Sequence, residues 1–244
     1  METLLQLDHP LRFACGPDLP CFTVCCSDLD LVLTPYDLLR LQRRLGLSSE
    51  QFLARYTERQ LRGRADLPFL FLRMRDDEKK SCPFLTPQGC AVYSDRPLAC
   101  RLYPLGLLPP APEIKSGGEE FKLIQEPDCQ GHQQQPEWMV KEWLADQCPG
   151  EELDLGRAFS GLCFDPQLRN RPLTLDQREL FYTAAYNFDR LRRLISEDGF
   201  FKPYLKDPEL AARLLTDDIA LIRYGLSWLR SCLLSEAERS ANSG

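Results

Sequence analysis

Long apolar runs, an N-terminal positive charge and an excess of basic residues are all missing from this sequence of 244 residues. No apolar stretch approaches the roughly 20 residues that a membrane-spanning helix needs. The first ten residues contain no lysine or arginine, which excludes a secretory signal. The formal net charge of -6 argues against binding to nucleic acid or to a membrane surface, since both require a positive surface. These absences predict a cytoplasmic protein, and only a protein partner stays open.

Familiar catalytic motifs are absent as well. No G-x-G-x-x-G follows a strand pattern, and neither a phosphate-binding G-x-x-x-x-G-K nor an H-E-x-x-H is present. The sequence has two histidines, so a mechanism with a histidine base has little material. Many enzyme classes are therefore disfavoured, although a cofactor pocket without these motifs is not excluded.

Cysteine is the residue type that stands out. The sequence contains eleven cysteines, an odd number, whereas its 43% of hydrophobic residues is enough for an ordinary core without cross-links. Disulfide scaffolds are typical of small secreted domains, and a reducing cytosol keeps thiols free. Free thiols close together in such a protein indicate metal or redox chemistry.

Eight of the cysteines are concentrated in the first 130 residues. Turn-forming residues separate Cys15 from Cys21, which suits a backbone that bends around a metal. Cys25 and Cys26 are adjacent in the chain. Adjacent side chains on extended backbone point to opposite faces, so this pair could serve two metals. Two four-sulfur sites, one site with spare thiols and a polynuclear centre all stay open. The candidate ligands are Cys15, Cys21, Cys25, Cys26, Cys82, Cys90, Cys100 and Cys129.

The second part of this cysteine cluster has its own signals. Pro83 follows Cys82, and a ligand cysteine followed by proline is frequent in iron–sulfur loops. Gly89 before Cys90 permits a backbone conformation that other residues resist. The spacing and the Cys82-Pro83 pair favour an iron–sulfur cluster over zinc.

Neighbouring polar residues give weaker signals. Arg96 and Arg101 lie beside the cysteines and could offset the charge of four thiolates, although either could equally occupy a solvated face. His132 is a further candidate ligand, but a surface histidine is the more frequent outcome. The three remaining cysteines are expected to be core thiols without a role at the metal. They are Cys148, Cys163 and Cys232.

The predicted fold is mainly α-helical with short β-strands. We expect a cysteine-rich metal-binding core with irregular loops over residues 1–150, and a helical extension over 151–244 that can belong to the same core. Capping signals and apolar periodicity predict helices over 35–45, from 49, over 137–147, from 175 to before 199, and from 216. Short strands are predicted over 69–72, 91–93 and 121–124, with an exposed loop over 109–120.

These motifs resemble a known family. The residues Phe13-Ala-Cys15, Pro20-Cys21-Phe22, Cys25-Cys26, Cys82-Pro83-Phe84 and Cys100-Arg-Leu-Tyr-Pro104 closely resemble the YkgJ-like cysteine-cluster family. Those bacterial proteins are described as zinc- or iron-chelating domains, and the resemblance spans roughly residues 12–147. It implies that the eight clustered cysteines are the ligands. The spacing from Cys15 to Cys21 is longer than in members with a C-x2-C-x2-CC pattern, which puts the geometry of the first site in doubt.

Three functions follow from this reading. The first is a metal-chelating protein that binds an iron–sulfur cluster or zinc. The second is an iron–sulfur-dependent enzyme similar to protein lysine N-methyltransferases, because flagellin lysine-N-methylases look related through their cysteine arrangement. The third is a structural zinc module that serves protein interaction. Whether the chain is an enzyme stays open.

Overall fold

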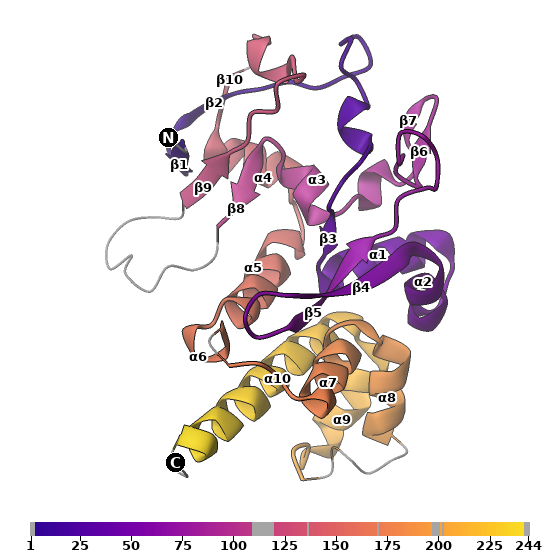
Figure 1. Ribbon diagram of the computed structural model, residues 1–244, viewed down its shortest axis with the longest axis vertical. Helices are drawn as coiled ribbons and strands as arrows, with labels where there is room; N and C mark the ends of the chain where they lie inside the picture. Colours follow the sequence, from indigo (N-terminus) through magenta and orange to yellow (C-terminus); the bar gives the residue numbers. More distant parts are fainter. Residues whose placement is uncertain are drawn as a thin grey trace.

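Helices and small sheets alternate along the chain (Figure 1). The computed structural model describes residues 3–108, 120–135, 137–169, 171–196, 201 and 203–241. The N-terminus lies at one end of the molecule with small sheets around it, and a group of helices forms the other end (Figure 1). The short strands are confirmed. The fold is mixed α/β rather than mainly α, because strands recur throughout the first 140 residues.

The first two helices begin where their capping signals predict. In α1 (Pro35–Leu45) the Thr34 hydroxyl accepts a hydrogen bond from the Asp37 N–H at 3.1 Å, and the Asp37 carboxylate accepts one from the Thr34 N–H at 2.8 Å. The reciprocal pair satisfies two backbone donors at the helix start. Gly46 ends α1 with a φ of 65°, a conformation that glycine adopts without strain. A second such pair begins α2 (Ser49–Tyr56).

A three-stranded antiparallel sheet follows, with strand order β3-β5-β4. The central strand β5 (Leu67–Leu72) is buried over most of its length, between β3 (Val32–Leu33) and β4 (Thr57–Arg62). The strand predicted over 69–72 is confirmed and is longer than predicted. Its apolar side chains belong to the larger of two hydrophobic cores, which also contains Leu38, Phe52 and Phe181.

The last hundred residues complete that larger core. Apolar side chains of α5, α7 and α10 pack against α1, and α8 packs against α7 and α2. Residues on both sides of position 150 therefore share one core, and the division of the chain there stays a prediction. The helices are α5 (Glu152–Cys163), α6 (Pro166–Arg169), α7 (Leu175–Tyr186), α8 (Phe188–Ser196), α9 (Pro208–Thr216) and α10 (Asp218–Ala241).

Two helix boundaries differ from the prediction, for the same physical reason. The helix expected from 175 to before 199 is broken at Asn187, whose side chain accepts a hydrogen bond from the Arg190 N–H and so caps α8. The last helix begins at Asp218 instead of 216, because the Asp217 carboxylate caps it through the Ala220 N–H at 3.0 Å. The predicted end before residue 199 lies outside the described residues.

The smaller hydrophobic core lies between two small sheets and two helices. One sheet has the order β1-β9-β8, and the other pairs β2 with β10. Leu11, Phe13, Leu102, Phe121 and Trp143 are buried in this core. The elements are β1 (Leu4–Gln6), β2 (Pro10–Arg12), α3 (Leu98–Leu102), β8 (Leu105–Leu107), β9 (Glu120–Leu123), β10 (Glu137–Met139) and α4 (Val140–Gln147).

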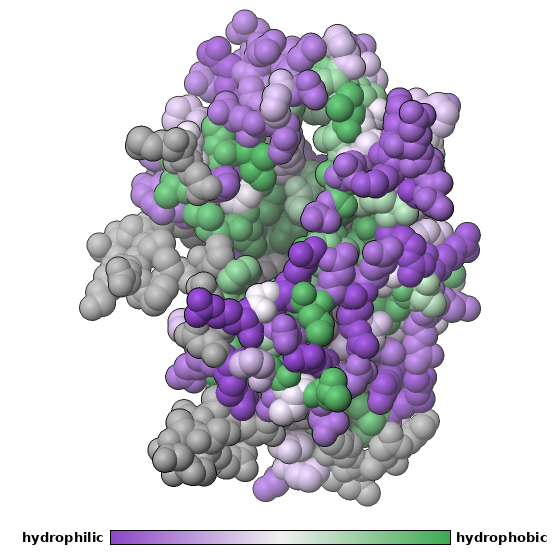
Figure 2. All heavy atoms as spheres, viewed as in Figure 1, coloured by the Kyte–Doolittle hydropathy of each residue, from purple (hydrophilic) through white to green (hydrophobic). Residues whose placement is uncertain are grey.

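Most of the surface in view is hydrophilic, and hydrophobic residues gather in a hollow over the region of α3, β8 and β9 (Figure 2). The strand predicted over 121–124 is confirmed as β9. The helix predicted over 137–147 begins only at Val140, because residues 137–139 pair with β2 instead. Of the loop predicted over 109–120, residues 109–119 lie outside the described residues, and Glu120 already belongs to β9.

The strand predicted over 91–93 is wrong. A two-residue hairpin pair, β6 (Leu85–Thr86) and β7 (Gly89–Cys90), ends at Cys90. The chain then turns into η2 (Tyr93–Asp95), with the Asp95 N–H donating to the Val92 carbonyl at 2.8 Å. The Ala91 N–H still donates to the Phe84 carbonyl at 2.9 Å, but strand pairing among the described residues ends at Cys90, and the segment of Ala91 and Val92 adopts a turn.

Within the described residues, no helix combines the length and the apolar character that crossing a bilayer demands.

Candidate metal centre

The adjacent cysteines Cys25 and Cys26 lie on a tight turn, not on extended backbone as predicted. They end η1 (Val24–Cys26), and the Cys26 N–H donates to the Thr23 carbonyl at 2.9 Å. Because the turn keeps both thiols close, the Cys26 thiol stabilises the Cys25 thiolate and lowers the pKa of Cys25 to about 7. The same pairing raises the pKa of Cys26, and burial raises it further.

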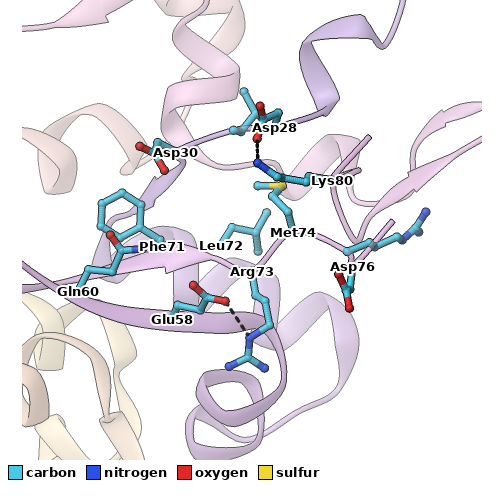
Figure 3. Close-up of a pocket in the computed structure, with 12 residues that line it drawn as sticks. Asp28, Asp30, Glu58, Gln60, Phe71, Leu72, Arg73, Met74, Asp76 and Lys80 are labelled. Atoms are coloured by element: carbon cyan, nitrogen blue, oxygen red, sulfur yellow. Dashed lines mark hydrogen bonds and ion pairs between the residues drawn. The ribbon is translucent and has the colours of Figure 1, made fainter. Parts of the chain in front are cut away.

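Backbone pairing brings Cys82 beside Cys26. The Cys82 N–H donates to the Cys26 carbonyl at 2.8 Å. The neighbouring residues Ser27 and Ser81 form an isolated antiparallel bridge. Two residues further, the Asp28 N–H donates to the Lys80 carbonyl, and the two side chains form an ion pair at 2.9 Å (Figure 3). That ion pair lies at the rim of a pocket of about 450 Å³ with apolar Phe71 in its lining. Two segments far apart in sequence are thus joined at their cysteines.

The hairpin places Cys90 close to Cys82. Leu85 pairs with Cys90 across β6 and β7, and the Leu85 N–H donates to the Cys82 carbonyl at 3.0 Å. Gly89 has a φ of 113°, which confirms that this position requires the freedom of glycine. A Cβ at Gly89 would also lie 3.1 Å from the Phe22 ring. The hairpin therefore packs directly against the segment that carries the first cysteines.

Cys100 is placed by α3. The Asp37 carboxylate, which is buried in α1, accepts a hydrogen bond from the Leu98 N–H at 2.7 Å and so satisfies a donor at the start of α3. Cys100 is exposed, and desolvation by the surrounding protein atoms raises its pKa to about 12. The negative charges of Cys82, Cys25 and Cys90 would raise it in the same direction, which places these thiols in its neighbourhood.

Cys15, Cys21 and Cys129 meet on the other side of the turn. The Ala14 N–H donates to the Gly131 carbonyl at 3.1 Å, and the Gln130 N–H donates to the Cys21 Sγ at 3.3 Å. Gly131 permits this approach, because a Cβ there would lie 2.4 Å from the Phe13 ring. Burial raises the pKa of Cys15, and the neighbouring thiols Cys25, Cys21 and Cys129 raise it further.

The structure therefore brings all eight predicted cysteines into one region. Within the described residues, no three histidine, cysteine, aspartate or glutamate side chains are arranged so that they could hold one metal ion. The donor set suits zinc or an iron–sulfur cluster, since soft thiolates bind both.

The two arginines considered as charge partners have a different role. Arg101 is buried and donates to the carbonyls of Arg96 at 3.1 Å and Gln147 at 2.9 Å, with the Glu152 carboxylate at 3.8 Å. Arg96 donates to the Tyr93 carbonyl at 2.7 Å and lies over the Tyr93 ring. Both hold the loop before α3 against the end of α4, and a role in offsetting the charge of the thiolates stays a prediction.

A different arginine, Arg75, lies beside the cysteines. Its guanidinium donates from one nitrogen to the carbonyls of Pro83 at 2.8 Å and Leu85 at 3.0 Å. Its charge also lowers the pKa of Cys82, although burial keeps the pKa of that thiol above its usual value. Arg75 lies seven residues before Cys82 in a highly charged stretch, so only the folded chain singles it out.

His132 packs edge-on against Phe13, with ring centroids 5.2 Å apart, and burial lowers its pKa. Its Nε2 is buried and has no hydrogen-bond partner among the described residues. The ring is therefore partly buried, not a surface histidine, and ligation by it stays a prediction. Cys148 and Cys163 are buried, as expected for core thiols, and Cys232 is partly buried in α10.

Comparisons with known proteins agree with this site. A family model described as "Putative zinc- or iron-chelating domain" matches residues 14–148, a range that contains all eight clustered cysteines. No curated protein and no solved structure matches the chain significantly. Because the matched range covers more than half of the sequence, the chain belongs to the CxxCxxCC family.

Proposed function

We propose that the chain chelates metal through its eight clustered cysteines and that the bound group is an iron–sulfur cluster rather than a zinc ion. One observation carries the proposal. Backbone hydrogen bonds join Cys26 to Cys82 and Ala14 to Gly131, so segments more than 50 residues apart meet at their cysteines. A core that needed only apolar side chains would have no reason to assemble thiols in this way.

The remaining thiols of the chain provide a contrast. Cys163 lies within the larger core, and burial alone raises its pKa well above the usual value. The clustered cysteines are exposed or partly buried instead, and their charges act on one another. Metal binding requires the thiols to lose their protons, which a solvent-accessible group of mutually close thiols can do when the metal arrives.

The local sequence supports iron–sulfur over zinc. No C-x2-C knuckle of the kind found in common zinc ribbons is present, whereas Cys82 is followed by Pro83. An iron–sulfur cluster would supply one-electron transfer when bound. The chain itself provides the thiolates, a clamp on the Cys82 loop through Arg75, and a positive charge near Cys82.

Anaerobic purification tests the proposal. We expect a coloured protein whose broad visible absorption bleaches on reduction, with iron and acid-labile sulfide in equal amounts. A colourless protein that contains stoichiometric zinc would show that the bound metal is zinc and not an iron–sulfur cluster, and would leave the proposal of metal binding intact. A protein without metal, in which all eight thiols react freely with an alkylating reagent, would overturn chelation itself.

Neither alternative function has an observation of its own in the described part of the chain. Methyl transfer to lysine would require a cofactor pocket beside the cysteines. The pocket next to Asp28 and Lys80 has charged residues around apolar ones and provides no specific support for such a cofactor. Protein interaction through the helices of residues 151–244 likewise stays a prediction.

A further inference from the structure

We propose that Cys26 and Cys82 form a redox-modification site, at which a low-molecular-weight disulfide such as glutathione disulfide converts the two thiols into a disulfide. The site goes beyond the proposed metal binding, because the reaction requires no metal. Only its effect on metal binding, the loss of two clustered thiols, rests on the proposed function.

The backbone places the two cysteines directly opposite each other. Ser27 and Ser81 form an antiparallel bridge, and one residue further along each segment are Cys26 and Cys82. The Cys82 N–H donates to the Cys26 carbonyl at 2.8 Å across this position. Opposed residues at a hydrogen-bonded position have Cα atoms about 5.5 Å apart and side chains on the same side. A disulfide requires Cα atoms about 4.4 to 6.8 Å apart, so the register suits one.

Contacts on the other side of the bridge hold this register. The Asp28 N–H donates to the Lys80 carbonyl at 3.0 Å, and the two side chains form an ion pair at 2.9 Å (Figure 3). The Asp77 carboxylate accepts a hydrogen bond from the Ser81 N–H at 2.8 Å. Because none of these contacts involves a thiol, they keep the two segments aligned independently of any group that the cysteines bind.

Neighbouring cysteines lack this arrangement. Cys25 and Cys26 are joined by a trans peptide bond. Adjacent Cα atoms across such a bond lie about 3.8 Å apart, which is below the range of a disulfide. Cys90 pairs across its hairpin with Leu85 and not with a cysteine. Within the described residues, strand and bridge pairing therefore opposes Cys26 to Cys82 and no other two cysteines.

Solvent can reach both thiols, as reaction with an oxidant requires. Cys26 and Cys82 are partly buried, whereas Cys163 is enclosed in the larger core. The susceptibility of a thiol to oxidation follows its exposure and its thiolate character. Cys163 should therefore stay reduced under conditions that link the opposed pair.

The reaction is thiol–disulfide exchange in two steps. One thiolate of the pair attacks a sulfur of glutathione disulfide, which breaks that S–S bond, releases one glutathione thiolate and leaves a mixed disulfide on the chain. The second thiolate attacks the cysteine sulfur of the mixed disulfide and releases the second glutathione thiolate. The two cysteines together lose two electrons and two protons. Glutathione disulfide takes up the electrons, and the two released thiolates take up the protons.

Oxidation of the metal-free wild-type chain with glutathione disulfide tests the site. Digestion without a reductant, followed by tandem mass spectrometry, locates the linked cysteines and does not depend on any variant folding. We expect a Cys26–Cys82 linkage as the main disulfide within the chain, and its loss on treatment with dithiothreitol. Predominant linkage of another pair, or glutathione on both cysteines without a linkage between them, would overturn the inference.

Serine variants provide a matched comparison. Cys26→Ser and Cys82→Ser should each lose the linked peptide, whereas Cys25→Ser, one residue away, should keep it. Loss of the linkage of Cys82 in Cys25→Ser, together with its retention in Cys26→Ser, would assign the disulfide to the wrong neighbour and overturn the inference.

Zinc binding separates this inference from the proposed function. The probe is Zn²⁺, added to the reduced chain and to the chain that carries the disulfide. We expect weaker zinc binding by the oxidised chain and recovery after dithiothreitol, and equal binding by both forms would overturn the effect on metal binding. A reduced chain that forms the disulfide but binds neither zinc nor iron would overturn metal binding and leave the modification site. A chain that binds zinc but does not link Cys26 to Cys82 would do the reverse.

Discussion

The Asp37 carboxylate in α1 accepts a hydrogen bond from the backbone N–H of Leu98 in α3 at 2.7 Å. The same carboxylate accepts one from the Thr34 N–H, and the Asp37 side chain is buried. One side chain thereby caps two helices and places α3, which carries Cys100. In the sequence Asp37 is recognisable only as a capping residue of α1. In the folded chain it also holds α3, which carries Cys100, a residue of the candidate metal centre.

Asp37→Ala is expected to destabilise the protein, because the buried Leu98 N–H and the part-buried Thr34 N–H lose their acceptor. A buried unsatisfied donor costs about 1 to 3 kcal/mol, and the part-buried one costs less because water can reach it, so the free energy of unfolding should fall by about 2 to 4 kcal/mol. Chemical denaturation measures it, with the exposed Glu78→Ala as the control, which should change the free energy by less than about 0.5 kcal/mol. Equal effects of the two substitutions would contradict the capping role.

Asp37 also predicts a pH dependence. Burial raises its pKa to about 6 in the folded chain, so the folded state binds a proton more tightly than the unfolded state does. Its contribution to stability is fully present below its usual pKa near 4 and is lost as the pH rises through about 6. The loss amounts to about 3 kcal/mol. Denaturation at pH 4.5 and pH 7.5 should show about 2 kcal/mol of this fall in the wild type relative to Asp37→Asn, and parallel curves would disprove it.

Arg75→Gln should weaken zinc binding by the clustered cysteines, because the clamp on the Pro83 and Leu85 carbonyls and the charge near Cys82 are lost together. Residues that support metal ligands in this way typically change affinity by about 10- to 100-fold. Competition with a chromogenic chelator measures the change. Arg64→Gln in the β4–β5 connection removes the same charge at an exposed position and should leave affinity unchanged. A similar loss in both variants would mean that overall charge, not the clamp, is responsible.

Gly131→Ala should separate Cys15 from Cys129. The added Cβ would lie 2.4 Å from the Phe13 ring and 2.8 Å from the Ala14 carbonyl, so the backbone must move apart. We expect a loss of about 1 to 3 kcal/mol in stability and weaker zinc binding by the clustered cysteines. Gly16→Ala is the matched control beside Cys15, where nothing lies within 4 Å of the added atom. Normal zinc retention in Gly131→Ala would show that this contact is dispensable.

Metal removal should leave the helices of residues 151–244 folded. Their larger core buries Phe181, Leu191 and Leu229, and among the described residues it includes none of Cys15, Cys21, Cys25 and Cys129. Removal of the metal with an added chelator is expected to lower the thermal midpoint of unfolding, since a ligand at 1,000 times its dissociation constant stabilises the folded state by about 4 kcal/mol. The helical circular dichroism signal should persist at 20 °C. Loss of this circular dichroism signal when the metal is removed would show that the metal is needed for the whole chain to fold.

Local signals in the sequence were enough for α1, because Thr34, Asp37 and Gly46 act within a few residues of one another. The break at Asn187 was missed because the apolar stripe continues through it, while its side chain caps the next helix. The strand expected over 91–93 fails because strand formation depends on a partner, and the pairing with β6 ends at Cys90.

The cysteines of the candidate site were predictable from their number and clustering, but their neighbours were not. Cys15 lies beside Cys129 because Ala14 pairs with Gly131, a contact without any counterpart in the local sequence. Arg75 is one of several charged residues before Cys82, and its role depends on where the two carbonyls point after folding. Long-range contacts of this kind exist only in the folded chain.

The pairing of Ala14 with Gly131 has a consequence for the order of events during synthesis. Cys15, Cys21, Cys25 and Cys26 are made first, and Cys129 is the last of the clustered cysteines to be made. For the proposed metal binding by all eight thiols, the early cysteines must stay reduced until Cys129 has left the ribosome. A cell that is short of reductant would therefore accumulate chains whose early cysteines have oxidised before the site is complete.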